Sequence, residues 1–146
     1  KKTVAPPKFE ELPNVENLHL KKLEATVLAI DDEDYILNLS ETILSEFGCK
    51  VIKVNNPDDA LRMMQENHQQ IHLVLLDISM PEMSGSELFQ HIRTISPNMP
   101  VIVCSGYQDD ERVVKLLGNE NVAFLAKPYV MQKMIHLVDQ MISHSV

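Results

Sequence analysis

The chain has 146 residues, of which 45% are hydrophobic and 23% charged, and its net charge is −8. This length suits one globular domain with a short appendage and excludes a large multidomain enzyme. Because the chain has 21 acidic but only 13 basic residues, no basic surplus is left for phosphate backbones, and direct nucleic-acid binding is not expected.

The number and spacing of the cysteines and glycines exclude several further classes of protein. Cys49 and Cys104 are too few for a disulfide framework and too far apart for a zinc ribbon, which favours a reducing, cytoplasmic compartment. No apolar run approaches the roughly 20 residues needed to span a bilayer, so we expect no membrane contact by this region, even if it is the cytoplasmic part of a membrane-anchored sensor. The four glycines lack the close spacing of a P-loop or a dinucleotide-binding loop.

Residues 1–25 differ in composition from the rest and are interpreted as a linker or N-terminal arm. They contain three of the eight prolines and carry almost no net charge, so the acidity belongs to residues 26–146, the predicted domain. Proline interrupts regular structure, which favours a linker, with a short helix expected around residues 15–23. A start at Lys1 indicates a piece of a longer protein.

Five short apolar runs, rich in β-branched residues, predict β-strands. In chain order they cover residues 26–30, 51–54, 73–76, 101–104 and 122–125. Several are apolar throughout, as expected for strands that are covered on both faces.

Amphipathic stretches between and after these runs predict five helices. A left-handed Gly48 is expected to end the first helix, and Asn56 to cap the start of the second. Ser84 and Glu87 have the spacing of a capping box that opens the third.

The last two helices complete the alternation of strands and helices. The fourth is predicted to hold the acids at 109–111 in its first turn and to stop at Gly118, and the fifth to bury a methionine stripe in the core. Such alternation predicts an α/β fold, and right-handed crossovers make its sheet parallel with helices on both faces.

Polar side chains stand where the predicted strands end. In an open parallel sheet the carboxyl ends of the strands form one ligand-binding crevice. We therefore expect a single site built from the polar residues that follow the first, third, fourth and fifth strands, namely Asp31, Asp32, Asp77, Ser105 and Lys127. Taken singly, each would be an ordinary loop, cap or surface residue, and their shared position favours a function.

The chemistry of this set favours a magnesium-assisted phosphoryl transfer. Three carboxylates repel one another unless a cation neutralises them, and Mg²⁺ prefers oxygen ligands, whereas zinc would call for His or Cys. A carboxylate beside Mg²⁺ can attack a phosphoryl group, and Asp77 is the expected nucleophile because it lies between the acidic pair and the Ser/Lys pair. Lys127 would supply a positive charge, and Ser105 a hydroxyl donor, to the phosphoryl oxygens.

Four motifs in these segments resemble those of response-regulator receiver domains, and the resemblance covers residues 26–146. The motifs read IDDE, LDISMPEMSG, CSGY and AKPY and occupy residues 30–33, 76–85, 104–107 and 126–129. The resemblance implies a flavodoxin-like (βα)5 fold, a doubly wound five-stranded parallel sheet with strand order 2-1-3-4-5.

The resemblance also implies roles for single residues. A phosphoryl group would pass from the phosphohistidine of a histidine kinase or phosphotransfer domain to Asp77, with Mg²⁺, or Mn²⁺ as a substitute, as cofactor. Asp32, Asp77 and the backbone carbonyl of Ser79 would hold the metal, and Asp31 would act mostly through water. Ser79 and Tyr107 occupy positions that tune the lifetime of the phosphoryl group.

The family pattern further implies a conformational switch. A cis peptide between Lys127 and Pro128 would aim the lysine into the site. Ser105 and Phe124 would form the switch pair, where Thr and Tyr are more usual, so Phe124 cannot make the hydroxyl contact. The face of the fourth helix, fifth strand and last helix would signal to a linked or separate effector and is the surface for a homodimer.

Other functions remain as alternatives. A small-molecule phosphatase would use the same aspartate but usually needs a second acid two residues later, where Ser79 stands. A non-phosphorylated scaffold, or pseudo-receiver, is disfavoured by the full set of site residues. Whether the chain counts as an enzyme is left open, because the domain would catalyse only its own phosphorylation and dephosphorylation, while its parent would be the kinase.

The parent protein is inferred from the ends of the chain. Because the sequence stops soon after the last helix, we expect the C-terminal receiver of a hybrid sensor histidine kinase. The runner-up is a receiver taken from a transcriptional or other response regulator.

Overall fold

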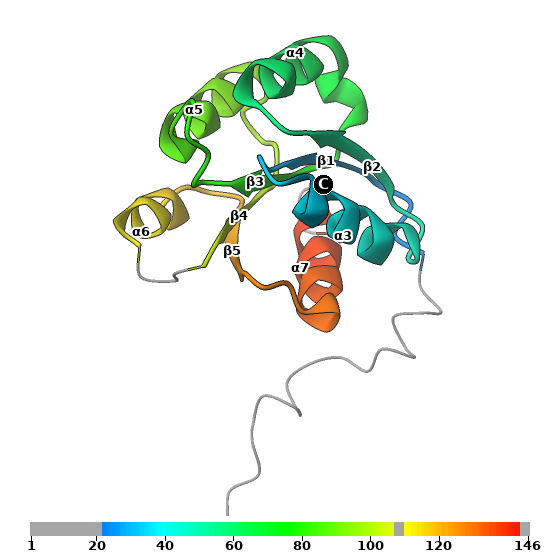
Figure 1. Ribbon diagram of the computed structural model, residues 1–146. Helices are drawn as coiled ribbons and strands as arrows, with labels where there is room; N and C mark the ends of the chain where they lie inside the picture. The colour runs from blue at the N-terminus through cyan, green and yellow to red at the C-terminus, as the bar shows by residue number, and fades with distance from the viewer. Residues whose placement is uncertain (1–21, 107–109, 144–146) are drawn as a thin grey trace, which may run out of the picture.

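Five parallel strands form the centre of the molecule (Figure 1). The computed structural model describes residues 22–106 and 110–143. The strands are β1 (Thr26–Ile30), β2 (Lys50–Val54), β3 (Leu73–Asp77), β4 (Val101–Ser105) and β5 (Val122–Ala126). Their order in the sheet is β2-β1-β3-β4-β5, which confirms the expected α/β topology.

Helices cover both faces of this sheet (Figure 1). They are α3 (Asp34–Ser45), α4 (Pro57–Asn67), α5 (Gly85–Ile95), α6 (Glu111–Leu117) and α7 (Met131–Ser143), and a short 3-10 helix, η1 (His68–Gln70), which was not predicted, follows α4. Residues of α4, α5 and α6 pack on one face, and residues of α3 and α7 on the other. The longest described helix has 13 residues, so none in the described part of the chain can cross a membrane.

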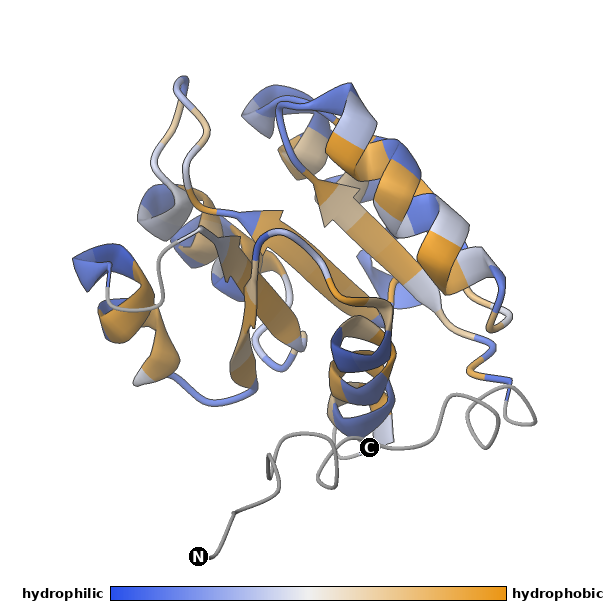
Figure 2. Cartoon of the chain, turned by 60° about the horizontal axis from the view of Figure 1, so that its bottom comes forward, coloured by the Kyte–Doolittle hydropathy of each residue, from blue (hydrophilic) through white to orange (hydrophobic). Residues whose placement is uncertain are grey.

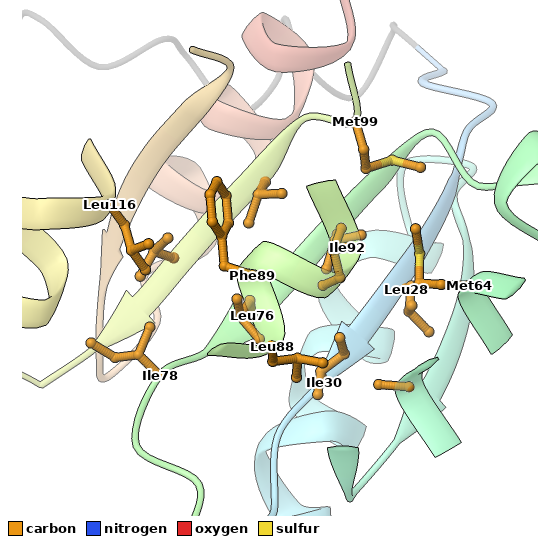
Figure 3. Packing of buried hydrophobic residues seen from close by; sticks show 14 of the residues in the cluster. Leu28, Ile30, Met64, Leu76, Ile78, Leu88, Phe89, Ile92, Met99 and Leu116 are labelled. Carbon is orange, nitrogen blue, oxygen red and sulfur yellow. The ribbon is translucent and has the colours of Figure 1, made fainter. Parts of the chain in front are cut away.

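The core consists of two apolar layers, one on each face of the sheet. Successive strand residues point to opposite faces, so Leu28 and Ile30 join the α4, α5 and α6 layer while Val27 and Ala29 join the other. Figure 3 shows the first layer, where Phe89 and Ile92 of α5 lie over the strands. Figure 2 shows the strands in hydrophobic colours and hydrophilic residues on the outer sides of the helices, as a doubly covered sheet requires.

Two predicted helix caps are confirmed. The Asn56 side chain accepts a hydrogen bond of 2.8 Å from the Asp59 amide at the start of α4, and Ser84 accepts one of 3.1 Å from the Glu87 amide at the start of α5. These bonds satisfy amides that have no partner within the helix.

Two helix ends differ from prediction by a few residues, and a third prediction is largely untested. α3 ends at Ser45, so Gly48, which is left-handed as expected (φ +90°), lies three residues beyond the helix. α6 begins only at Glu111, with Asp110 as its N-cap, whereas its end at Gly118 is as predicted. The helix expected around 15–23 lies outside the described residues, except for residues 22 and 23, which are not helical.

A close approach between Gly85 and Ile78 fixes the connection from β3 to α5. A Cβ atom at Gly85 would lie 2.5 Å from the Cα atom of Ile78, far inside van der Waals contact. Only glycine therefore allows α5 to begin against the residue that follows Asp77, and this contact positions the loop beside the strand ends.

Candidate functional site

The carboxyl ends of the strands bring the predicted site residues together. Asp77 and Ser105 are the last residues of β3 and β4, since both strands run one residue further than their apolar runs. Asp31 follows β1 directly. All three side chains are buried, with Asp31 and Asp77 each only 2% exposed.

Lys127 brings a positive charge into this buried acidic group. Its Nζ lies 2.7 Å from Asp31 Oδ2 and 3.5 Å from Asp77 Oδ1, and its side chain is 17% exposed. The predicted cis Lys127–Pro128 peptide is present, and the Lys127 amide donates a 2.9 Å hydrogen bond to the Ser105 carbonyl. This hydrogen bond joins the carboxyl end of β5 to the carboxyl end of β4.

Burial and charge act in opposite directions on the ionisation of this pair. Burial raises the pKa of Asp31, and hydrogen bonds from Lys127 and the Glu33 amide offset only part of that effect. Burial alone would lower the pKa of Lys127, but the bond to Asp31 and the charges of Asp77 and Asp31 outweigh it and raise that pKa. The ammonium form of Lys127 is therefore favoured as long as the carboxylates are charged.

The two oxygens of Asp77 have different surroundings. Oδ1 accepts hydrogen bonds from the Ser79 amide at 3.1 Å and the Ser79 hydroxyl at 2.8 Å. Oδ2 is buried and has no hydrogen-bond partner among the described residues. A buried carboxylate oxygen without a partner is costly, so this atom is where a ligand or a bond would be expected.

The acidic side chains at this edge of the sheet can bind a metal ion. Asp31, Asp32 and Asp77 each offer a carboxylate oxygen, and these oxygens lie within 4.8 Å of one another. Asp32 is exposed and lines an open cleft of about 680 Å³, together with Pro81 and Glu82. Because the donors are all oxygens, they suit a hard divalent cation, and such a cation could satisfy the unpartnered Oδ2 of Asp77.

Of the other predicted residues, one contacts the acidic group, one lies on the sheet and one lies outside the described residues. Ser79 lies at the site, where its side chain contacts Asp77 directly. Phe124 is half-buried on β5 and packs against the α4, α5 and α6 layer of the core, so it lines the sheet rather than the acidic group. Tyr107 lies outside the described residues.

Two contributors to the site were not found from the sequence. The Glu33 amide donates a 2.9 Å hydrogen bond to Asp31 Oδ1, and Arg112 on α6 donates a 3.1 Å hydrogen bond to the carbonyl of Ile78. A backbone amide carries no residue-type signal. Arg112 is separated from Ile78 by 34 positions, and its sequence context is that of a solvated helix.

Cys104 lies next to Asp77 in the strand register but is a core residue, as predicted. Burial raises the pKa of its thiol to about 12. Burial also raises the pKa of Tyr129, whose ring packs against the same layer. Both groups stay protonated at neutral pH, so neither adds charge to the site.

Comparison with known proteins agrees with this arrangement. The model of the Response regulator receiver domain family matches residues 27–139. The autoinducer 1 sensor kinase/phosphatase LuxN of Vibrio campbellii is 28% identical over 122 residues, which are 84% of this chain and 14% of LuxN. The sensor kinase CckA of Brucella abortus is 30% identical over 118 residues, 81% of this chain and 12% of CckA.

Solved structures show the same fold. A response regulator receiver domain protein from Clostridium thermocellum superposes with a TM-score of 0.77 at 29% identity, over 82% of this chain and 94% of that one. The receiver domain of the hybrid histidine kinase CckA gives a TM-score of 0.69 at 26% identity, over 80% and 98%. This chain thus spans whole isolated domains but only a small part of the sensor kinases.

Proposed function

Because the chain belongs to the response regulator receiver domain family, we propose that it accepts a phosphoryl group on Asp77 from the phosphohistidine of a histidine kinase or phosphotransfer domain. In this step a carboxylate oxygen of Asp77 forms a bond to phosphorus, and the electron pair of the breaking P–N bond goes to the histidine nitrogen. The observation that carries the proposal is the buried Oδ2 of Asp77, which has no partner among the described residues although its neighbour Oδ1 is satisfied.

The proposed cofactor is Mg²⁺, for which Mn²⁺ would substitute. Asp32, Asp77 and the Ser79 carbonyl would hold it, with Asp31 acting mostly through water, and the bound ion would screen the charge on the phosphoryl oxygens. The oxygen-only donor set supports this choice. Lys127, which bridges Asp31 and Asp77, is close enough to exchange a carboxylate for a phosphoryl oxygen, and Ser105 would donate its hydroxyl to another.

The phosphorylated state would be read on the surface of α6, β5 and α7. We propose that Ser105 and Phe124 change position when the phosphoryl group arrives, and that Ser79 and Tyr107 set how long it stays. Exposed apolar side chains, Val114 on α6 at 59% and Val130 directly before α7 at 47%, support a role in contacting an effector or a second copy of the chain.

We propose that the parent protein is a hybrid sensor histidine kinase, with this domain in the cytoplasm. The similarity to the sensor kinases LuxN and CckA supports this parent. A receiver from a transcriptional regulator is the second candidate, because ZraR of Klebsiella oxytoca, a transcriptional regulatory protein, is also 28% identical over 122 residues.

The proposal is tested by incubating the purified chain with Mg²⁺ and acetyl phosphate and measuring its mass. We expect the mass of one phosphoryl group to be added, only when Mg²⁺ is present, and to be lost in Asp77→Asn. Asp139→Asn, which removes an equal charge on α7 outside the acidic group, is the matched control and should still be labelled. Labelling of Asp77→Asn to the same extent as the control would exclude Asp77 as the acceptor.

A further inference from the structure

Arg112 connects α6 to the segment that carries the acidic site. Its Nη1 donates a 3.1 Å hydrogen bond to the carbonyl oxygen of Ile78, the residue between Asp77 and Ser79. One of these neighbours is the proposed phosphoryl acceptor, and the other is its hydrogen-bond donor. The guanidinium thus holds the backbone at the middle of the site segment.

Asp110 fixes the orientation of the guanidinium. Asp110 Oδ1 accepts from Arg112 Nε at 3.1 Å, and Asp110 Oδ2 accepts from Nη2 at 2.7 Å, so the pair is bidentate. The same carboxylate accepts a 2.9 Å bond from the Arg112 amide as the N-cap of α6. The side chain of Asp110 is only 16% exposed, whereas that of Arg112 is 45% exposed, so the carboxylate of this ion pair is the more shielded partner.

The Ile78 side chain packs in the core, and its backbone has two uncharged contacts besides the bond to Arg112. Its amide donates a 3.3 Å hydrogen bond to the Cys104 carbonyl, and its Cα lies against Gly85. Among the described residues, Arg112 is the charged side chain that donates to the Ile78 carbonyl, while the Ser79 amide of the same peptide unit donates to Asp77 Oδ1. The carboxylate of Asp77, together with the stronger effect of Asp110, raises the pKa of Arg112, so the cation lies within the field of the acceptor.

We propose that Arg112 is a positioning residue for the phosphorylated state, which holds the Ile78 carbonyl and places a positive charge next to the backbone segment that follows Asp77. The inference rests on the proposed function. A phosphoryl group adds negative charge at Asp77, so a nearby cation favours the phosphorylated form over the free carboxylate. The same cation repels a metal ion in the acidic group, so its two effects have opposite signs.

This difference in sign separates positioning from a purely structural role. Loss of structure around Ile78 would weaken the binding of metal and of a phosphoryl mimic together. Loss of the positive charge would weaken only the binding of the anion, and would leave Mg²⁺ affinity unchanged or increase it.

The experiment measures two affinities in the full chain: Mg²⁺ alone, and beryllofluoride at saturating Mg²⁺, followed by ¹⁹F and ¹⁵N NMR. We expect Arg112→Ala and Arg112→Gln to bind beryllofluoride about fivefold more weakly, a loss typical of one partly screened cation, and to bind Mg²⁺ at least as tightly as the wild type. Arg112→Lys, which keeps the charge and can still donate a hydrogen bond, should bind beryllofluoride more tightly than Arg112→Gln does.

The matched control is Arg62→Ala. Arg62 forms a similar 2.7 Å pair with Asp59 on α4, so its removal changes the net charge equally and should leave both affinities unchanged. Three outcomes would each overturn the inference. Arg112→Ala could bind beryllofluoride as tightly as the wild type, or it could lose equal affinity for Mg²⁺ and beryllofluoride. Arg112→Lys could also bind beryllofluoride no more tightly than Arg112→Gln does. If the wild type bound neither ligand, the proposed function would fail as well.

Discussion

The two ends of the sheet each contain a buried or half-buried cation, but the partners of these cations differ. At the amino ends of β4 and β5, Arg93 donates to the backbone carbonyls of Met99 and Glu120, the latter at 2.5 Å, and stacks 4.9 Å from the centre of the Phe89 ring. At the carboxyl ends, Lys127 faces the carboxylates of Asp31 and Asp77.

The difference separates a cation with a structural role from one with a proposed functional role. Backbone carbonyls carry no net charge, and only folding gathers those of Met99 and Glu120 around Arg93, so this cation joins two loops without forming a charged site. The carboxylates around Lys127 carry excess negative charge and one unpartnered oxygen, so their arrangement becomes favourable only with an added cation or group. We therefore expect ligand-dependent stability at one end of the sheet and ligand-independent stability at the other.

The largest effect is expected from Gly85→Ala at the site end. A new Cβ would lie 2.5 Å from a backbone atom of Ile78, so either α5 or the site loop must shift. We expect the free energy of unfolding to fall by about 3 kcal/mol in urea titrations, with loss of Mg²⁺ binding. Gly118→Ala is the control, because its Cβ would lie at an ordinary 3.5 Å from the nearest atom. Equal stability of the two variants would show that this close approach does not constrain the site.

Arg93→Ala tests the opposite end. The variant loses hydrogen bonds to the carbonyls of Met99, Glu120 and Asn121 and the contact with Phe89. We expect about 2 kcal/mol of destabilisation in urea titrations, with unchanged Mg²⁺ affinity and unchanged phosphorylation. A change in Mg²⁺ affinity would show that the two ends of the sheet are not independent.

Lys127→Ala should make the stability of the protein depend on metal bound at the carboxyl ends of the strands. Without the ammonium group, Asp31 loses its 2.7 Å partner and the carboxylates repel, so the metal-free protein should be about 1.5 kcal/mol less stable, with Mg²⁺ bound at least as tightly as in the wild type. Saturating Mg²⁺ should restore most of the stability, as measured by thermal unfolding with and without the ion. Lys53→Ala, which breaks the exposed pair with Glu41, is the control and should show no such rescue.

The smallest effect is a decline in stability at alkaline pH caused by Cys104. Its folded pKa of about 12 lies above the usual thiol pKa of 9.0, so its contribution to stability is complete below about pH 9 and is lost as the pH rises towards 12. Burial raises the pKa of Cys49 in the same direction. Unfolding measured at about pH 8 and pH 10 should show a decline that is smaller in Cys104→Val. An identical decline in this variant would assign it to other groups.

Most of the fold could be predicted from the sequence because its signals are local. Apolar runs identified all five strands, and Asn56 and Ser84 marked the starts of α4 and α5. The strand ends were predicted one residue short at Asp77 and Ser105, because polar residues usually end a buried strand, whereas here they continue the ladder.

Some residues of the site could be predicted from the sequence, and others could not. The acidic group and Lys127 followed from their positions after the strands, and the structure brings them together. Contacts such as Arg112 with Ile78 and Arg93 with Glu120 cross many positions between elements, and each depends on how two helices lie over the sheet. No residue pattern near these arginines carries that information.

The unequal depth of the three carboxylates has a consequence for how the domain would exchange ions with its surroundings. Asp32 lies at the rim of an open cleft, whereas Asp31 and Asp77 lie beneath it. A hydrated cation arriving from bulk water would meet the outer carboxylate first and shed its waters in stages, with no need for any helix to open. Metal loading should then equilibrate quickly with the free ion concentration, and a chelator should strip the site at a rate set by water exchange rather than by unfolding.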